Sequence, residues 1–318
     1  MTAETQTGSY LERLRGRIEL RLADAQTLQA LKTFSEILWS HASQGDLDTR
    51  SIEDDAGLTI DSWKKFAAKQ YGAVTVSVAN PVHARDGWQS THTVVRVMGP
   101  DMPFMVDSAL IALAQDGNIT HHLNNVIFNV ERGADGSAVL VEEATASSSK
   151  ELFVHLEIDR VADAELEEVS ARLRKTVTDL RAVVRDYGAM KDQLAKIVEQ
   201  LKTDPPALAE EEIREALVFL DWLATNNFTF LGYREFEYVD DVIRQCGTPL
   251  GILSERSHAS ERELSAQPDS TRQFLLQPTL LSFSKSGTKS RVHRPAYPDY
   301  VGVKKFSTDG QVIGEWGF

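Results

Sequence analysis

Two short stretches, Asp101-Met102-Pro103-Phe104 and Asp116-Gly117-Asn118-Ile119, bound a helix that decides the expected fold of this chain. Alternating residues over 91–98 predict a strand before the first stretch, and residues 119–130 predict another after the second. Pro103 suits the first turn of the helix, because its missing N–H would have no intrahelical partner there. The glycine of the second stretch is expected to end the helix. The local order is therefore strand, helix, strand.

Signals further along the chain extend this pattern. Asp135-Gly136 predicts a hairpin turn into a third strand near 137–142. Apolar and polar residues alternate over 152–158, which is typical of a half-buried antiparallel strand. Asp163 suits the N-cap of a long helix that follows. The pattern favours an antiparallel sheet with helices packed on it.

The opening of the chain is expected to be helical. Residues 9–43 place apolar side chains at three-to-four spacing, which predicts helix. Asp61 suits the N-cap of a further helix that carries aromatic residues. Residues 1–88 are therefore expected to form a helical N-terminal block whose task is packing.

A turn at Asp204-Pro205-Pro206 indicates a boundary in the second half of the chain. Residues 89–204 are expected to hold the strands described above and the long helix. Residues 205–318 are expected to hold a linker helix and a second, ACT-like αβ unit. The sequence ends within the second strand of an expected hairpin at Asp309-Gly310, so this unit is expected to be truncated. The predicted fold class is α+β.

Composition limits the classes of function. The formal net charge is −13 at pH 7, which disfavours binding to nucleic acid or to an anionic membrane, because phosphates attract basic surfaces. Cys246 is the only cysteine, so no internal disulfide is possible, and we expect an ordinary small residue rather than a redox group. The sequence contains no signal-peptide core and no apolar run of membrane-spanning length. A soluble, cytoplasmic protein is expected.

The sequence lacks the motifs of a self-contained enzyme. It has no Gly-x-Gly-x-x-Gly dinucleotide cradle, no phosphate-binding Gly-x-x-x-x-Gly-Lys, no Gly-x-Ser-x-Gly nucleophile turn and no His-Glu-x-x-His zinc motif. We therefore expect no catalytic residue, no metal site and no cofactor within this chain.

Two groups of side chains need a choice between a site and a structural role. His121 and His122 are adjacent on an expected strand and point to opposite faces, whereas His92 and His155 could meet across neighbouring strands. We expect all four to be solvated or hydrogen-bonded rather than metal ligands. A basic cluster near the end of the chain could hold an anion or a carboxylate, but a solvated surface that pairs with acidic groups is the simpler expectation. Its members are Lys285, Lys289, Arg291, His293 and Arg294.

The two opening stretches resemble the ACT domain, a ferredoxin-like βαββαβ module. ACT domains often carry Asp-x-Pro-Gly at the first turn and Gly-x-Asn-Ile at the start of the second strand. In such a site a ligand carboxylate would bind the N–H groups at the helix start, and Asp101 would accept from the ligand ammonium group. Alternatively, Asp101 only caps the helix. Phe104 stands where amino-acid-binding ACT domains have glycine. The candidate effector-binding residues are Asp101, Met102, Pro103, Phe104, Asp107 and Asn118.

Three longer segments, in the same order, resemble the large bacterial NAD-dependent glutamate dehydrogenases. They are Pro100-Asp101-Met102-Pro103-Phe104-Met105-Val106-Asp107-Ser108, then Asn227-Phe228-Thr229-Phe230-Leu231-Gly232-Tyr233-Arg234, then Arg291-Val292-His293-Arg294-Pro295 with Asp299-Tyr300-Val301-Gly302-Val303-Lys304. One departure is Asn125-Val126, where many relatives carry His-Pro. The resemblance implies a parent enzyme that oxidises L-glutamate to 2-oxoglutarate and ammonia with NAD. Its catalytic domain would lie beyond Phe318.

Two functions follow from this resemblance. One is a regulatory module that binds an amino-acid effector, and the other is a structural oligomerisation module without a ligand. In both, the expected partners are the chain's own downstream catalytic domain and further copies of the protein. A free-standing enzyme is a third, minor possibility.

Overall fold

The computed structural model describes most of the chain, and by its contacts the chain divides into two compact units, Met1–Val177 and Thr178–Phe318. The class is α+β, as the sequence predicts. The described residues are 3–40, 42, 45, 50–115, 117–133, 137–141, 144–254 and 261–318. The hairpin signal Asp135-Gly136 and Asp116 of the second opening stretch lie outside these residues.

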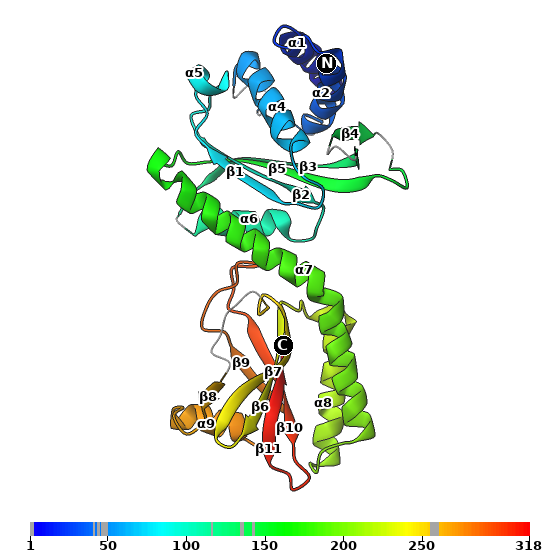
Figure 1. Cartoon of the computed structure of the whole chain (residues 1–318), viewed down its shortest axis with the longest axis vertical. Helices are drawn as coiled ribbons and strands as arrows, with labels where there is room; N and C mark the ends of the chain where they lie inside the picture. Colours follow the sequence, from blue (N-terminus) through cyan, green and yellow to red (C-terminus); the bar gives the residue numbers. More distant parts are fainter. Residues whose placement is uncertain are drawn as a thin grey trace. The chain divides into compact units, whose positions relative to one another are not determined.

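The described strands of the first unit form a five-stranded antiparallel sheet in the order β1-β2-β5-β3-β4 (Figure 1). The strands are β1 (Thr75–Ala79), β2 (Thr93–Pro100), β3 (Thr120–Arg132), β4 (Ala138–Val141) and β5 (Ser149–Ile158). β5 lies at the centre, where it pairs with both β2 and β3. β5 is buried on both faces, so the expectation of a half-buried strand over 152–158 is wrong. Helices cover both sides of the sheet, so even the polar residues of β5 are buried.

The strand order corrects the predicted βαββαβ sequence of elements. β2, α6 (Met105–Ala114), β3 and β5 follow the expected order. The edge position beside β2 is filled by β1, which comes before these elements rather than after the long helix. The prediction of a purely helical block over 1–88 is therefore wrong. The reason is local: Thr75-Val76-Ser77-Val78-Ala79 is rich in β-branched residues and alternates polar with apolar side chains, which suits an edge strand.

One face of the sheet is covered by α1 (Ala3–Glu19), α2 (Ala25–Leu38) and α4 (Ile52–Ala67), and the opposite face by α6 and the start of α7 (Leu166–Thr203) (Figure 1). The N-terminal helices share one hydrophobic core with the sheet. At its centre Phe34 stacks on Phe128, with 4.9 Å between ring centroids. The N-terminal helices and the sheet are therefore two layers that share one hydrophobic core.

The helix expected to begin at Asp61 begins earlier in the chain. Ser51 is the N-cap of α4, and its side chain accepts a hydrogen bond from the backbone N–H of Asp54. Three acidic residues in the first turn favour this start. Asp61 lies inside the helix, where it accepts a hydrogen bond from Arg96 at 2.7 Å. The prediction that Asp61 caps a helix is wrong, because Asp61 lies inside α4 and binds Arg96 of β2.

The second unit is a six-stranded antiparallel sheet in the order β8-β7-β6-β11-β10-β9. The strands are β6 (Gly232–Val239), β7 (Val242–Gly251), β8 (Glu261–Glu263), β9 (Leu281–Lys285), β10 (Asp299–Phe306) and β11 (Val312–Gly317). The end of α7 and α8 (Glu210–Trp222) build a core on one face. A short 3-10 turn, η1 (Asp163–Glu165), precedes α7, η2 (Leu223–Asn227) follows α8, and the helix α9 (Asp269–Leu276) lies between β8 and β9.

This second sheet is not built as an ACT-like βαββαβ unit, because its described elements follow the order β6-β7-β8-α9-β9-β10-β11, with one helix between strands. β6 and β7 are connected through Asp240 and Asp241, both with positive φ, which is the backbone of a tight hairpin turn. β10 and β11 form the hairpin predicted at Asp309-Gly310. The segment between β7 and β9 holds β8 and α9, and its residues 255–260 lie outside the described part of the chain. Within the described part, no helix combines the length and apolar character needed to cross a bilayer.

Candidate functional site

The expected effector site begins at the N-terminus of α6. The helix starts at Met105, so Pro103 precedes it and is not in its first turn as predicted. Phe104 is the N-cap and has φ 65°, in the left-handed region. A non-glycine residue pays about 1–2 kcal/mol to adopt this conformation. The backbone at Phe104 therefore has the shape that glycine adopts most readily, which gives a physical reason for the glycine expected at this position from the resemblance to ACT domains.

Asp101 lies at the end of β2 rather than on the helix. Its backbone N–H donates to the carbonyl of Lys150 at 3.0 Å, which extends the pairing with β5. Its side chain is exposed, and the N-cap position belongs to Phe104. The carboxylate is thus available to solvent beside the helix start, together with that of Asp107 in the first turn.

Asn118 lies at the other end of α6. Its side-chain Nδ2 donates to the carbonyl of Leu113 at 3.3 Å, which satisfies an acceptor at the helix C-terminus. A helix of ten residues is about 15 Å long. Within one chain the structure therefore brings together residues 101–107 and leaves Asn118 apart from them.

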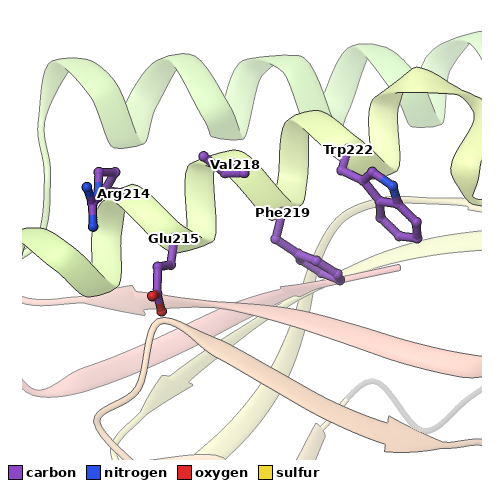
Figure 2. Close-up of a pocket in the computed structure, with 5 residues that line it drawn as sticks. All are labelled: Arg214, Glu215, Val218, Phe219 and Trp222. Atoms are coloured by element: carbon purple, nitrogen blue, oxygen red, sulfur yellow. The ribbon is translucent and has the colours of Figure 1, made fainter.

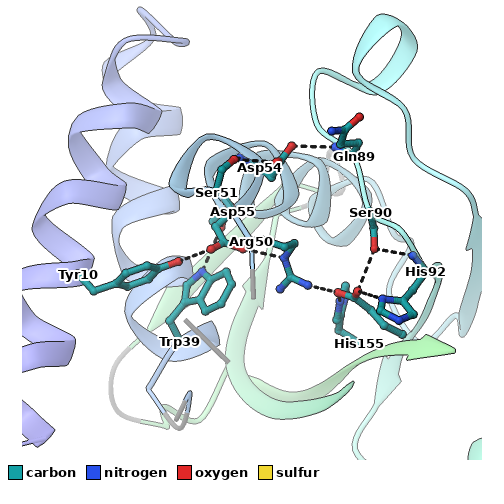
Figure 3. A network of polar contacts seen from close by, with 12 residues as sticks. Tyr10, Trp39, Arg50, Ser51, Asp54, Asp55, Gln89, Ser90, His92 and His155 are labelled. Carbon is teal, nitrogen blue, oxygen red and sulfur yellow. Dashed lines mark hydrogen bonds and ion pairs between the residues drawn. The ribbon is translucent and has the colours of Figure 1, made fainter. Parts of the chain in front are cut away.

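A buried polar network that the sequence did not reveal lies between the N-terminal helices and the sheet (Figure 3). Arg50 is its hub, because its Nε donates to Asp55 at 2.9 Å and its Nη1 pairs with Glu157 of β5. The hydroxyl of Tyr10 in α1 donates to Asp55 at 2.7 Å. Three segments far apart in the chain are thereby joined through charged groups.

Glu157 also connects two of the histidines. Nε2 of His155 lies 3.1 Å from one carboxylate oxygen, and Nδ1 of His92 lies 3.5 Å from the other. Ser90 donates to the same carboxylate at 3.0 Å. Burial would raise the pKa of Glu157, but the hydrogen bond from His155 and the charge of Arg50 hold it well below its usual range. His155 of β5 and His92, which lies just before β2, thus meet at one carboxylate rather than on two neighbouring strands.

The same surroundings keep His155 uncharged. Burial lowers its pKa to about 4, and the charge of Arg96 on the adjacent strand acts in the same direction. His121 has a separate partner, Asp159, at 2.7 Å. Among the described residues, no group of three or more histidine, cysteine, aspartate or glutamate side chains is arranged to hold a metal ion.

The pKa of His155 sets an expected pH dependence of stability. In the unfolded chain His155 binds a proton near pH 6.5, whereas in the folded chain it does so only near pH 4. The contribution of His155 to the free energy of unfolding is therefore fully present above pH 6.5. It is lost as the pH falls from 6.5 to 4, by up to about 3 kcal/mol. Urea denaturation at pH 7 and pH 5 measures this loss. In His155→Gln, the free energy of unfolding should change less between these two pH values. An unchanged loss in that variant would contradict the assignment.

A second buried ionic cluster gives a structural role to residues 299–304, which belong to the third of the three segments described above. Lys304 of β10 pairs with Glu315 of β11 at 2.6 Å and donates to the carbonyl of Leu275 at 3.0 Å. Tyr300 and Ser282 donate to the same carboxylate. Residues 300, 302 and 304 alternate along β10, so their side chains face one side of the sheet. The segment carries a buried ion pair and the residues that satisfy it.

Two glycines make room for this cluster. A Cβ on Gly302 would overlap the hydroxyl of Ser282 and the carboxylate of Glu315. A Cβ on Gly317 would overlap the hydroxyl of Tyr300. The glycine of the Tyr300-x-Gly302-x-Lys304 pattern is required for close approach and not for a turn.

The basic cluster near the end of the chain partly pairs with acidic groups. Lys285 lies 2.6 Å from Asp299, and Arg291 lies 3.3 Å from Asp179. These two ion pairs agree with the expectation of a surface whose basic groups pair with acidic ones. Burial raises the pKa of Cys246 to about 11, so its thiol stays protonated near neutral pH and is not an activated nucleophile.

Comparison with known proteins assigns the first unit to a class of domain. Residues 34–173 match the family described as "Glutamate dehydrogenase, ACT1 domain". The match begins within α2, so the family's domain includes N-terminal helices that the sequence suggested as a separate block.

Relatives extend the similarity over nearly the whole chain. It is 34% identical to the NAD-specific glutamate dehydrogenase of Halomonas elongata over 97% of its length, and 34% identical to that of Pseudomonas aeruginosa over 92%. The chain is homologous to the N-terminal ACT region of the large NAD-specific glutamate dehydrogenases. It spans only 20% and 19% of the length of these two relatives.

Proposed function

We propose that this chain is a non-catalytic regulatory or assembly region of a large NAD-dependent glutamate dehydrogenase. The parent reaction would convert L-glutamate, NAD and water to 2-oxoglutarate, ammonia and NADH. The observation that carries the proposal is the match of residues 34–173 to an ACT1 domain within a chain that spans about a fifth of its relatives. A region of this kind acts on a catalytic domain elsewhere in the protein.

The absence of dinucleotide and nucleophile motifs from the sequence supports the non-catalytic part of the proposal. NAD would be bound by the parent enzyme outside this region. The partners would be the catalytic domain of the same polypeptide and further copies of the protein.

The regulatory form of the proposal places an amino-acid effector at the N-terminus of α6. The first turn of a helix offers N–H groups and a partial positive charge to a carboxylate. The exposed carboxylate of Asp101 lies beside that turn and suits an ammonium group. Met102, Pro103, Phe104 and Asp107 would form the rest of this site, and Asn118 could contribute only indirectly within one chain.

Phe104 gives the sharpest test of this site. Phe104→Gly keeps the left-handed backbone and removes the half-buried ring, so an amino acid can approach the helix start more closely. We expect a panel of amino acids that includes L-glutamate to raise the melting temperature of the variant more than that of the parent chain.

The matched control is Asn226→Gly, because Asn226 also has φ 65° but lies in the second unit. It should leave any response to amino acids unchanged. If no amino acid shifts the melting temperature of either the parent chain or Phe104→Gly, the regulatory form is wrong.

The structural form of the proposal is favoured by two observations. Phe104 places a bulky side chain at the helix start, and Asn118 is occupied with the opposite helix end. In this form the chain joins subunits and binds no effector. Sedimentation of the chain distinguishes the two forms, because a strictly monomeric chain would contradict the structural one.

A further inference from the structure

An exposed apolar surface lies on the second unit, over α8 and the edge of its sheet. Val218 and Trp222 of α8 are 66% and 50% exposed, and Phe283 of β9 is 56% exposed. Phe219 joins them, because its ring meets that of Phe283 edge-on at 5.4 Å. We call these four residues the α8–β9 face. Single exposed apolar residues are ordinary, but four in contact mark an interaction surface.

The helix side of this face is hollowed (Figure 2). The hollow has a volume of about 480 Å³ and is lined by one helical stripe of α8. Its lining residues are Arg214, Glu215, Val218, Phe219 and Trp222. Charged groups therefore occupy one end of the hollow, and Trp222 occupies the other.

The strand side of the face is a sheet edge. Among the described strands, β9 pairs only with β10 and ends the order of the six-stranded sheet. Such an edge presents unpaired backbone N–H and C=O groups that can take another strand. The segment Leu281-Ser282-Phe283-Ser284-Lys285 contains no proline, and its one charged residue lies at its end. β9 is thus open to pairing in the described structure.

The charges on this face have opposite signs at its two ends. The backbone N–H of Leu280 donates to Glu212 at 2.8 Å, which places the start of β9 beside the first turn of α8. From Glu212 to Phe219 the helix rises about 10 Å, and from Leu280 to Phe283 the strand advances about 10 Å. The helix and the strand therefore run side by side in the same direction.

Acidic groups gather at the start of the face. Glu210, Glu211 and Glu212 form the first turn of α8, and Glu215 follows one turn later. Arg214 is paired with Glu211 at 2.9 Å and leaves the other carboxylates in excess. Lys285 lies at the opposite end of the face, and its ion pair with Asp299 is exposed to solvent.

We propose that two copies of this chain pair through the α8–β9 face about a twofold axis. β9 would run antiparallel to β9 of the second copy, which continues the sheet across the interface. A twofold axis through Phe283 sets the acidic end of each face against Lys285 of the other, and opposite charges that meet across an interface favour the pairing. A second copy satisfies the edge, the apolar surface and the charges together. The proposal rests on the assembly form of the proposed function.

Sedimentation equilibrium of the whole chain tests this proposal. The chain should be a dimer, and Phe283→Lys or Trp222→Glu should raise its dissociation constant at least about tenfold, because each places a charge in the apolar centre. Tyr71→Lys is the matched control, since Tyr71 is an exposed aromatic residue of the first unit. It should leave the dissociation constant unchanged.

A charge exchange keeps the test valid if the apolar variants fail to fold. Lys285→Glu and Glu215→Lys each alter an exposed side chain and should each weaken the dimer. Their combination should restore it. A chain that is monomeric at all concentrations would overturn the proposal, and so would a dimer that is insensitive to all four substitutions. Either result leaves the response to amino acids to be scored separately, so failure of the dimer is distinct from failure of the regulatory form.

Discussion

Replacing Lys304 with methionine is expected to lower the free energy of unfolding of the second unit by about 3–5 kcal/mol. The ammonium group and Glu315 are both buried, 0% and 3% exposed, and lie 2.6 Å apart. Without Lys304, the carboxylate of Glu315 keeps its hydrogen bonds from Tyr300 and Ser282. It loses the positive charge that pairs with it. An uncompensated buried charge costs much more than a lost surface contact.

Hydrogen exchange along β10 and β11 under increasing urea measures this loss for the second unit alone. Arg244→Met is the control, because it removes the exposed ion pair with Glu261 and should cost less than about 1 kcal/mol. The double variant Lys304→Met/Glu315→Leu should recover much of the stability lost in Lys304→Met. Equal losses of stability in Lys304→Met and Arg244→Met would mean that the buried ion pair stabilises the fold no more than an exposed one.

Replacing Phe34 with alanine is expected to destabilise the first unit by about 3–5 kcal/mol. The ring is fully buried and touches the rings of Phe128 and Phe153 on the sheet at 4.9 and 5.7 Å. It also meets Phe66 of α4 at 5.9 Å. Its removal leaves a cavity where two helices and two strands meet, so the helices and the sheet should lose protection together.

Leu20→Ala is the control for this prediction, because Leu20 lies in the turn between α1 and α2 and its side chain is largely exposed. Its effect should stay within about 0.5 kcal/mol. Hydrogen exchange of α4 and β5 provides the measurement. Suppose that Phe34→Ala lowered the protection of α4 from hydrogen exchange but left β5 protected. The N-terminal helices and the sheet would then be separate folding units, as the sequence suggests.

Local signals in the sequence predicted the elements that depend on neighbouring residues. The α6 helix, its flanking strands and the turn at Asp309-Gly310 follow from spacing and turn chemistry within a few residues. The place of β1 beside β2 depends on a partner nearly twenty residues away, so no local pattern gives it. Phe104 was recognised as standing at a glycine position, but its positive φ is set by the surrounding structure rather than by its own preference.

The buried ionic clusters lay beyond prediction for a similar reason. Arg50 and Glu157 are 107 positions apart in the sequence, and a lone arginine or glutamate carries no signal of its partner. The segment around Lys304 was recognised by resemblance, but its role became clear only when strand register placed Glu315 and Ser282 beside it. Residue types alone would have favoured a solvated basic surface.

We propose above that this chain is a non-catalytic region that acts on the catalytic domain of a glutamate dehydrogenase. The most direct measurement is L-glutamate-dependent reduction of NAD by three proteins. These are the chain alone, the Pseudomonas aeruginosa relative without its matching region, and that relative with this chain in place of the region. We expect no reduction of NAD by the chain alone. We expect impaired assembly or regulation in the shortened relative, and recovery when this chain replaces the missing region. Reduction of NAD by the chain alone, or a replacement that behaves like the shortened relative, would contradict the proposal.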